Sequence, residues 1–161
     1  MNPPRSRPAC SRCSTQAASS NANTLDDYEE GSWTPVLGGS GGTSGQTYGT
    51  RSGNYVKIGQ FVWAQFYFDL TAKGTITGSA QLQQLPFTVG GTSGYTGVCI
   101  GRWQGFNTAM VWVGGYAEAG NTYVNLQGIT AAATSSGTNL VTGDFTNTTG
   151  FIGSLVFQAT A

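Results

Sequence analysis

From residue 33 onward, the chain consists of short runs in which apolar and polar residues alternate, separated by segments rich in glycine. A period of two is typical of β-strands that bury one face, and glycine-rich segments between such runs are typical of tight turns. The pattern predicts strands at residues 33–37, 46–50, 54–58, 60–72, 79–84, 96–104, 109–116, 121–128, 138–142 and 149–160. The one candidate for a helix, 127–133, is rich in alanine, and we expect it to form a loop or strand edge instead.

This many short strands in about 130 residues predicts an all-β fold, a jelly-roll-like antiparallel β-sandwich. No internal repeat of 20–50 residues is visible, which excludes a propeller or a solenoid. The clearest strand, 60–72, carries aromatic residues at successive positions. Both of its faces must therefore be covered, one by the core and the other by a second sheet or a second subunit.

The segment before that strand predicts a hairpin. We expect Gly53 and Gly59 to bracket a strand, with Gly59 in the tight turn that returns the chain antiparallel. Lys57 alternates with Val56 and Ile58, so we expect Lys57 to point outward and its two neighbours to point into the core.

Residues 1–24 show neither periodicity, and they contain three of the five prolines. They also carry Arg5, Arg7 and Arg12 and no acidic residue, whereas residues 25–30 carry four acidic residues and no basic one. This composition predicts an extended N-terminal arm over residues 1–24, ordered only by a partner. The β-sandwich domain is expected to occupy residues 25–161.

Composition adds a constraint on the surface. Only 9% of the 161 residues are charged, 39% are hydrophobic, and the formal net charge is zero. A neutral chain has no field that would steer it to nucleic acid or to an acidic membrane, and no apolar run approaches the length of a membrane span. Either other subunits bury much of the surface, which we favour, or Ser, Thr and Asn solvate it.

The residue types argue against catalysis. The chain has no histidine, so triads and metal sites that depend on histidine are excluded. Outside residues 25–30, the carboxylates are Asp69, Glu118 and Asp144, which we interpret as surface or turn residues. We expect a protein that is not an enzyme and that needs no cofactor.

Two features could bind metal. Cys10 and Cys13 have the spacing of a metal knuckle, but a zinc site needs four ligands. Thiolates from three arms could combine at a threefold axis, or neighbours could form disulfides, although reduced thiols are the favoured reading. The acidic residues 26–30 lack the ligand spacing of a calcium loop. Cys99, between Val98 and Ile100, is expected to be a small core residue.

Four segments resemble, in order, a small β-domain of bacteriophage fibre and head-surface proteins. Residues 25–35 (LDDYEEGSWTP) resemble its opening motif, and residues 51–62 resemble one of its hairpins. Residues 84–88 resemble its Leu-Pro-Phe turn, and residues 150–160 resemble its closing strand. The resemblance implies a homotrimeric virion protein that is made in the cytoplasm of the bacterial host.

Such domains usually stand at the end of a fibre, whereas here about 24 residues precede the domain. We therefore expect a capsid decoration (cement) protein or a short head fibre, located on the capsid surface of the virion. The arm would dock on the major capsid protein. Its binding residues are expected to be Arg5, Arg7, Arg12, Asp26, Asp27, Tyr28, Glu29, Glu30 and Trp33.

The alternative is a tail-fibre or receptor-binding tip that recognises host surface polysaccharide. Six aromatic residues could include a platform for stacking sugars: Trp63, Tyr95, Trp103, Trp112, Tyr116 and Tyr123. Most of them lie in predicted strands, where core or trimer packing is the favoured reading. Trp103 and Phe106 flank Gly105 in a predicted turn, and they are the best candidates for contact with a glycan.

Overall fold

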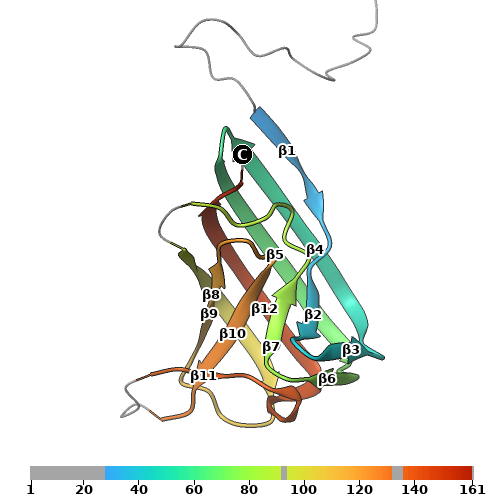
Figure 1. The fold of residues 1–161 in the computed structure, drawn as a ribbon. Helices are drawn as coiled ribbons and strands as arrows, with labels where there is room; N and C mark the ends of the chain where they lie inside the picture. The colour runs from blue at the N-terminus through green and yellow to red at the C-terminus, as the bar shows by residue number, and fades with distance from the viewer. Residues whose placement is uncertain (1–27, 92–93, 132–135, 161) are drawn as a thin grey trace, which may run out of the picture.

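A computed structural model describes residues 28–91, 94–131 and 136–160, and these form an all-β fold with no α-helix (Figure 1). The elements are β1 (Tyr28–Trp33), β2 (Val36–Gly39), β3 (Gly42–Ser44), β4 (Thr47–Ile58), β5 (Phe61–Ala72), β6 (Thr75–Thr77), β7 (Ala80–Gln83), β8 (Tyr95–Phe106), β9 (Trp112–Glu118), β10 (Tyr123–Ile129), β11 (Thr138–Asn139), the 3₁₀ turn η1 (Thr142–Asp144) and β12 (Phe145–Gln158). The predicted all-β class is confirmed. The predicted arm, residues 1–24, lies outside the described residues.

One antiparallel sheet contains all strands except β3 and β6, which pair with each other. Its order is β1-β4-β5-β12-β8-β9-β10-β7-β2, and β11 pairs with β10. The sheet curls, so that β2, β7 and β10 lie across the molecule from β4, β5 and β12 (Figure 1). The two edge strands, β1 and β2, are consecutive in the chain, and the backbone N–H of Leu37 in β2 donates a hydrogen bond to the Tyr48 hydroxyl of β4 at 3.0 Å.

The core fills the space inside the curl. In β5 the alternation is strict: Val62, Ala64, Phe66, Phe68 and Leu70 are buried. Aromatic rings from β12 and β8 complete this centre, with Phe151 5.2 Å from Phe68 and 5.5 Å from Phe106 between ring centroids. Burying each such side chain contributes about 1.5–3 kcal/mol to folding.

The hairpin between β4 and β5 is as predicted at Gly59, whose φ of 58° lies in the left-handed region that glycine adopts without strain. The prediction that Gly53 ends a strand is wrong, because β4 runs unbroken through it. The prediction for Lys57 is also wrong. Lys57 pairs with buried Val62 and its Nζ lies 5.7 Å from the centroid of the Phe87 ring, on the inner side of the sheet. Val56, its neighbour, therefore faces outward beside Trp63.

Cys99 is a further correction, because its side chain is exposed. Val98 and Ile100 are both buried. In a strand, the residue between two inward-facing residues must point to the opposite side. The alternation that placed Val98 and Ile100 in the core therefore excludes Cys99 from it.

Candidate functional site

The outer side of the layer formed by β1, β4, β5, β12 and β8 exposes large apolar residues. The exposed fraction is 54% for Phe61, 38% for Trp63, 40% for Ile152 and 45% for Val156. We define Phe61, Trp63 and Val156, together with Val56, as the outer apolar face. Ile152 lies apart from them on the same side, because it pairs with Tyr67 and Arg102. A contiguous exposed apolar surface of this kind marks an interaction site in a soluble protein.

Strand register brings these residues together. Val56 of β4 pairs with Trp63 of β5, and Trp63 pairs with Val156 of β12, so the three side chains form one row across three strands. In the row nearer the β4–β5 hairpin, Phe61 lies between Ile58 and Gln158. Because cross-strand neighbours on one face lie within contact distance, these two rows make a continuous apolar surface.

Farther from the hairpin, the same face becomes polar. One row consists of uncharged polar side chains and a thiol: Asn54, Gln65, Ser154 and Cys99. Beyond it, Arg102 Nη2 donates to Gln104 Oε1 at 2.5 Å, and Gln104 Nε2 donates to Asp69 Oδ1 at 3.0 Å. The Tyr67 hydroxyl also donates to Asp69, and this hydrogen bond raises the pKa of Tyr67. The face is thus apolar at one end and hydrogen-bonded at the other.

Trp63 stands between two hollows on this face. One, of about 260 Å³, is lined by Trp63, Gln65, Cys99, Gly101, Ile152, Gly153 and Ser154. The other, of about 430 Å³, is lined by Glu30, Gly31, Asn54, Tyr55, Val56 and Trp63. A protruding aromatic ring next to concave surface is the shape that lets one copy of a face interlock with another. A third groove, of about 470 Å³, lies at the hairpin end between Phe61 and Tyr95.

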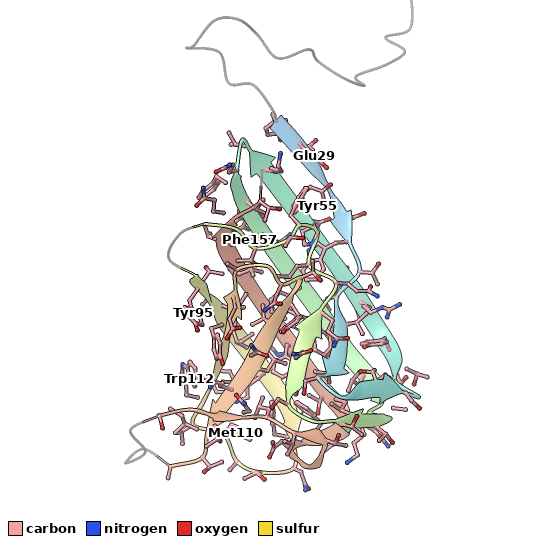
Figure 2. The ribbon with its side chains drawn as sticks, viewed as in Figure 1. Glu29, Tyr55, Tyr95, Met110, Trp112 and Phe157 are labelled. Atoms are coloured by element: carbon pink, nitrogen blue, oxygen red, sulfur yellow. The ribbon has the colours of Figure 1, made fainter. Side chains whose placement is uncertain are left out.

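The described part of the acidic motif, Tyr28, Glu29 and Glu30, lies on the edge strand β1. Figure 2 shows Glu29 on β1 beside Tyr55 on β4, where the Tyr55 hydroxyl donates to Glu29 Oε1 at 2.7 Å. This hydrogen bond raises the pKa of Tyr55, and a similar bond from Tyr28 to Glu30 raises the pKa of Tyr28. Charged residues on a sheet edge oppose the addition of further strands.

Glycine explains why this motif folds as it does. Gly31 pairs with Tyr55, and a Cβ at Gly31 would lie 2.7 Å from the Tyr55 hydroxyl oxygen. Gly53 pairs with Trp33, and a Cβ there would lie 2.4 Å from Trp33 Nε1. Each aromatic ring therefore lies across the glycine opposite it, an arrangement that covers the backbone at glycine positions.

The predicted partner-binding residues are not all on the surface. Tyr28, Glu29 and Glu30 are exposed on β1, whereas Trp33 is 8% exposed and its Nε1 donates to the Gln65 carbonyl oxygen at 3.1 Å. The Trp33 side chain thus packs in the core of the subunit, and its contact with a partner stays a prediction. The other residues of that set, and both cysteines of the knuckle, lie outside the described residues: Arg5, Arg7, Cys10, Arg12, Cys13, Asp26 and Asp27.

The predicted glycan contacts occupy a different environment from the expected one. Trp103 and Phe106 lie in β8, not in a turn, and both pack against the hydrophobic core. The sequence predicts the end of this strand at residue 104 because glycine is common in turns. In the structure, Gly105 has a φ of 68° and β8 continues through it. Contact of either residue with a glycan stays a prediction.

The carboxylates outside the acidic motif lie on separate elements: Asp69 on β5, Glu118 at the end of β9, and Asp144 in η1. Over the described ranges, no three His, Cys, Asp or Glu side chains gather in a group that could hold a metal ion. Over the same ranges, no helix is long and apolar enough to span a membrane.

The sequence alone did not identify the outer apolar face. The aromatic residues at successive positions of strand 60–72 indicate that both faces of this strand are covered, but they do not indicate which residues of other strands lie beside them. Comparisons of the chain with family models, with curated proteins and with solved structures give no match.

Proposed function

We propose that this protein is a structural component of a bacteriophage virion, a capsid decoration (cement) protein or a short head fibre. Its domain, a jelly-roll-like sandwich, assembles as a homotrimer, and residues 1–24 dock on the major capsid protein. The protein acts by binding across neighbouring capsomers, which stabilises the assembled shell by mass action. It performs no catalysis.

The observation that carries the assembly role is the outer apolar face. Phe61 and Trp63 alternate with buried residues of β5, so one strand has apolar residues on both sides. Among the described residues of a single subunit, no second layer covers the outer side, and Phe61 is 54% exposed. Aromatic residues are enriched where subunits meet, and a second and a third copy of this chain would remove them from water.

Support for the virion comes from the four ordered segments that resemble phage fibre and head-surface domains. Support for docking through the arm comes from Arg5, Arg7 and Arg12, which have no acidic neighbour within residues 1–24. Arginine forms bidentate hydrogen bonds with carboxylates on a protein lattice. The alternative, a tail-fibre tip, is favoured by the exposure of Trp112 at 42% on another part of the surface.

Assembly is tested by sedimentation equilibrium of the purified full chain. We expect a mass of three chains, and we expect Trp63→Asp to give monomers because it places a charge within the apolar surface. Trp112→Asp is the matched control, an exposed tryptophan outside the outer apolar face, and it should remain trimeric. A monomeric wild-type chain, or a trimeric Trp63→Asp variant, would contradict the proposed interface.

Docking is tested by co-sedimentation with particles assembled from the major capsid protein. We expect the full chain to sediment with these particles and the chain lacking residues 1–24 to stay in solution as a folded trimer. Unchanged binding of the truncated trimer would exclude the arm as the anchor. Binding to purified tails and not to capsids would favour the tail-fibre alternative.

A further inference from the structure

Trp112 lies flat on the outside of the sheet, on β9, which is separated from Trp63 on β5 by β12 and β8. A Cβ at Gly114 would lie 2.3 Å from Trp112 Cζ2, and a Cβ at Gly137 would lie 3.3 Å from Trp112 Cζ3. The six-membered ring thus covers backbone at both glycines. The side chain is nonetheless 42% exposed, so part of the ring is open to solvent. Figure 2 shows Trp112 on the flank of the molecule, far from Glu29 on β1.

Amide side chains lie next to this ring. Gln127 of β10 pairs with Gly114 on one side and with Asn139 of β11 on the other. Gln127 Nε2 donates to Asn139 Oδ1 at 3.3 Å, and Asn139 Nδ2 donates to Ser79 Oγ at 3.2 Å. These two hydrogen bonds fix the side-chain amides of Gln127, which pairs with the glycine under the ring, and of Asn139, one strand farther away. Each amide carries two N–H hydrogens and an acceptor oxygen, so each can also form a hydrogen bond with a ligand.

The amide row continues across the layer. Gln81 Nε2 donates to Asn125 Oδ1 at 3.2 Å, and Gln83 Nε2 donates to Gln81 Oε1 at 3.0 Å. In the described part of the chain, the strands β2, β7, β9, β10 and β11 contain a single charged residue, Glu118. Glu118 is the last residue of β9, whereas Trp112 is the first.

This chemistry selects the class of ligand. A nucleic acid or an anionic headgroup needs lysine or arginine, which these strands do not supply. An apolar peptide would cover the amides without satisfying their hydrogen bonds, which is unfavourable. A pyranose ring has one face of C–H groups and a rim of hydroxyls. The C–H groups can stack on an indole, and the hydroxyls can exchange hydrogen bonds with amides.

We propose that Trp112, Gln127 and Asn139 form a binding subsite for a neutral pyranose unit of a glycan. Trp112 supplies the stacking surface, and the two amides orient the hydroxyls. The subsite goes beyond the proposed assembly role, because it lies outside the outer apolar face and uses none of its residues. It also differs from Trp103 and Phe106, the glycan contacts expected from the sequence.

The test is NMR of the full-length protein labelled with ¹⁵N, which reports the indole N–H signal of Trp112. The probes are neutral oligosaccharides of glucose, galactose, mannose or N-acetylglucosamine, with a galactose oligosaccharide capped by sialic acid as the anionic comparison. We expect at least one neutral probe to shift the Trp112 signal in a saturable way. Trp112→Ala should weaken binding of that probe roughly tenfold, the effect of losing one aromatic stacking contact.

Two further variants separate the roles. Gly114→Ala keeps the indole but places a Cβ under it, so it should also weaken binding. Tyr95→Ala, the matched control, removes a 68% exposed aromatic ring that belongs neither to the subsite nor to the outer apolar face, and it should leave binding unchanged.

The proposed subsite is refuted if no neutral probe shifts the Trp112 signal, or if Trp112→Ala binds the probe as tightly as the wild type does. It is also refuted if Trp112→Ala dissociates the trimer, because the ring would then be a subunit contact. A failure of the homotrimer proposal would appear instead as a monomeric wild-type chain that still binds sugar through Trp112.

Discussion

The pairing of Trp33 with Gly53 predicts an unusually costly glycine-to-alanine change in the middle of a strand. Gly53 has an extended backbone conformation in β4, and alanine normally suits a strand better than glycine does. Here the added Cβ would lie 2.4 Å from Nε1 and 2.6 Å from Cε2 of Trp33. The indole is 8% exposed and belongs to the hydrophobic core, so a shift of the ring disturbs packed neighbours.

Two terms give the magnitude. Overpacking of a filled site costs about 1–3 kcal/mol. Displacing the indole also breaks the hydrogen bond from Trp33 Nε1 to the Gln65 carbonyl oxygen, which is worth about 1 kcal/mol net. Together these terms lower the free energy of unfolding of Gly53→Ala by about 2–4 kcal/mol.

A double-mutant cycle isolates the contact. Trp33→Ala alone should cost about 3–5 kcal/mol, but in that background Gly53→Ala meets no ring and should be nearly neutral or slightly stabilising. The coupling between the two sites is then about 2–4 kcal/mol. The control is Gly97→Ala in β8, a glycine with no heavy atom within 4 Å of an added Cβ, which should be near neutral.

The assay is urea unfolding followed by far-ultraviolet circular dichroism, because fluorescence would change with the loss of Trp33 itself. Each variant is measured at two protein concentrations, since association adds to apparent stability. If Gly53→Ala costs as much in the Trp33→Ala background as in the wild type, the proposed steric cause is wrong.

Three further outcomes are expected. The hydrogen bond to Glu29 raises the pKa of Tyr55 above 10.0, so the stabilising effect of this bond is present below that pH and is lost as pH rises through the folded-state pKa. Glu29→Gln should lower the Tyr55 pKa, which NMR of ¹³C-labelled tyrosine measures. An unchanged pKa would contradict the contact. Thr149 is fully buried, and its hydroxyl donates to the Gly105 carbonyl oxygen at 2.5 Å. Thr149→Val should lower the free energy of unfolding by about 1–3 kcal/mol, whereas Thr148→Val, at an exposed position, should lower it less. Equal effects would argue against a role for burial. Cys99 is exposed in the hollow beside Trp63. In a protein with Cys10 and Cys13 replaced by serine, the Cys99 thiol should react slowly with a maleimide in the trimer and at least about tenfold faster in the Trp63→Asp variant, because association covers the thiol. Equal rates would place the subunit contact elsewhere.

The positions of the strands followed from local pattern, but their lengths did not. In the sequence, Gly53 and Gly105 predict breaks between strands, because glycine is common in turns. In the structure, both lie inside long strands. The ring of Trp33, a residue twenty positions earlier in the chain, lies over Gly53. Such a contact is invisible to a local window, because it exists only once β1 and β4 have paired.

The orientation of a short amphipathic segment was likewise undecided by the sequence. In residues 56–58, two apolar residues flank a lysine, and pattern alone directs the apolar pair inward. The register with β5 reverses this, because Lys57 pairs with buried Val62. A shift of one residue exchanges the two faces of a strand, so pairing partners, and not hydropathy, set which side of β4 is the outside.

For this protein, the sequence by itself determined the all-β class, the hairpin at Gly59 and the double-sided character of strand 60–72. These depend on residue types and on a period of two, which are local properties. Only the tertiary structure decided that the apolar excess of β5 lies beside Val56 and Val156 on one outer face, and that Trp112 lies flat against Gly114. Cross-strand neighbours come from distant parts of the chain, so their meeting depends on sheet order and register, which the alternation of residues does not encode.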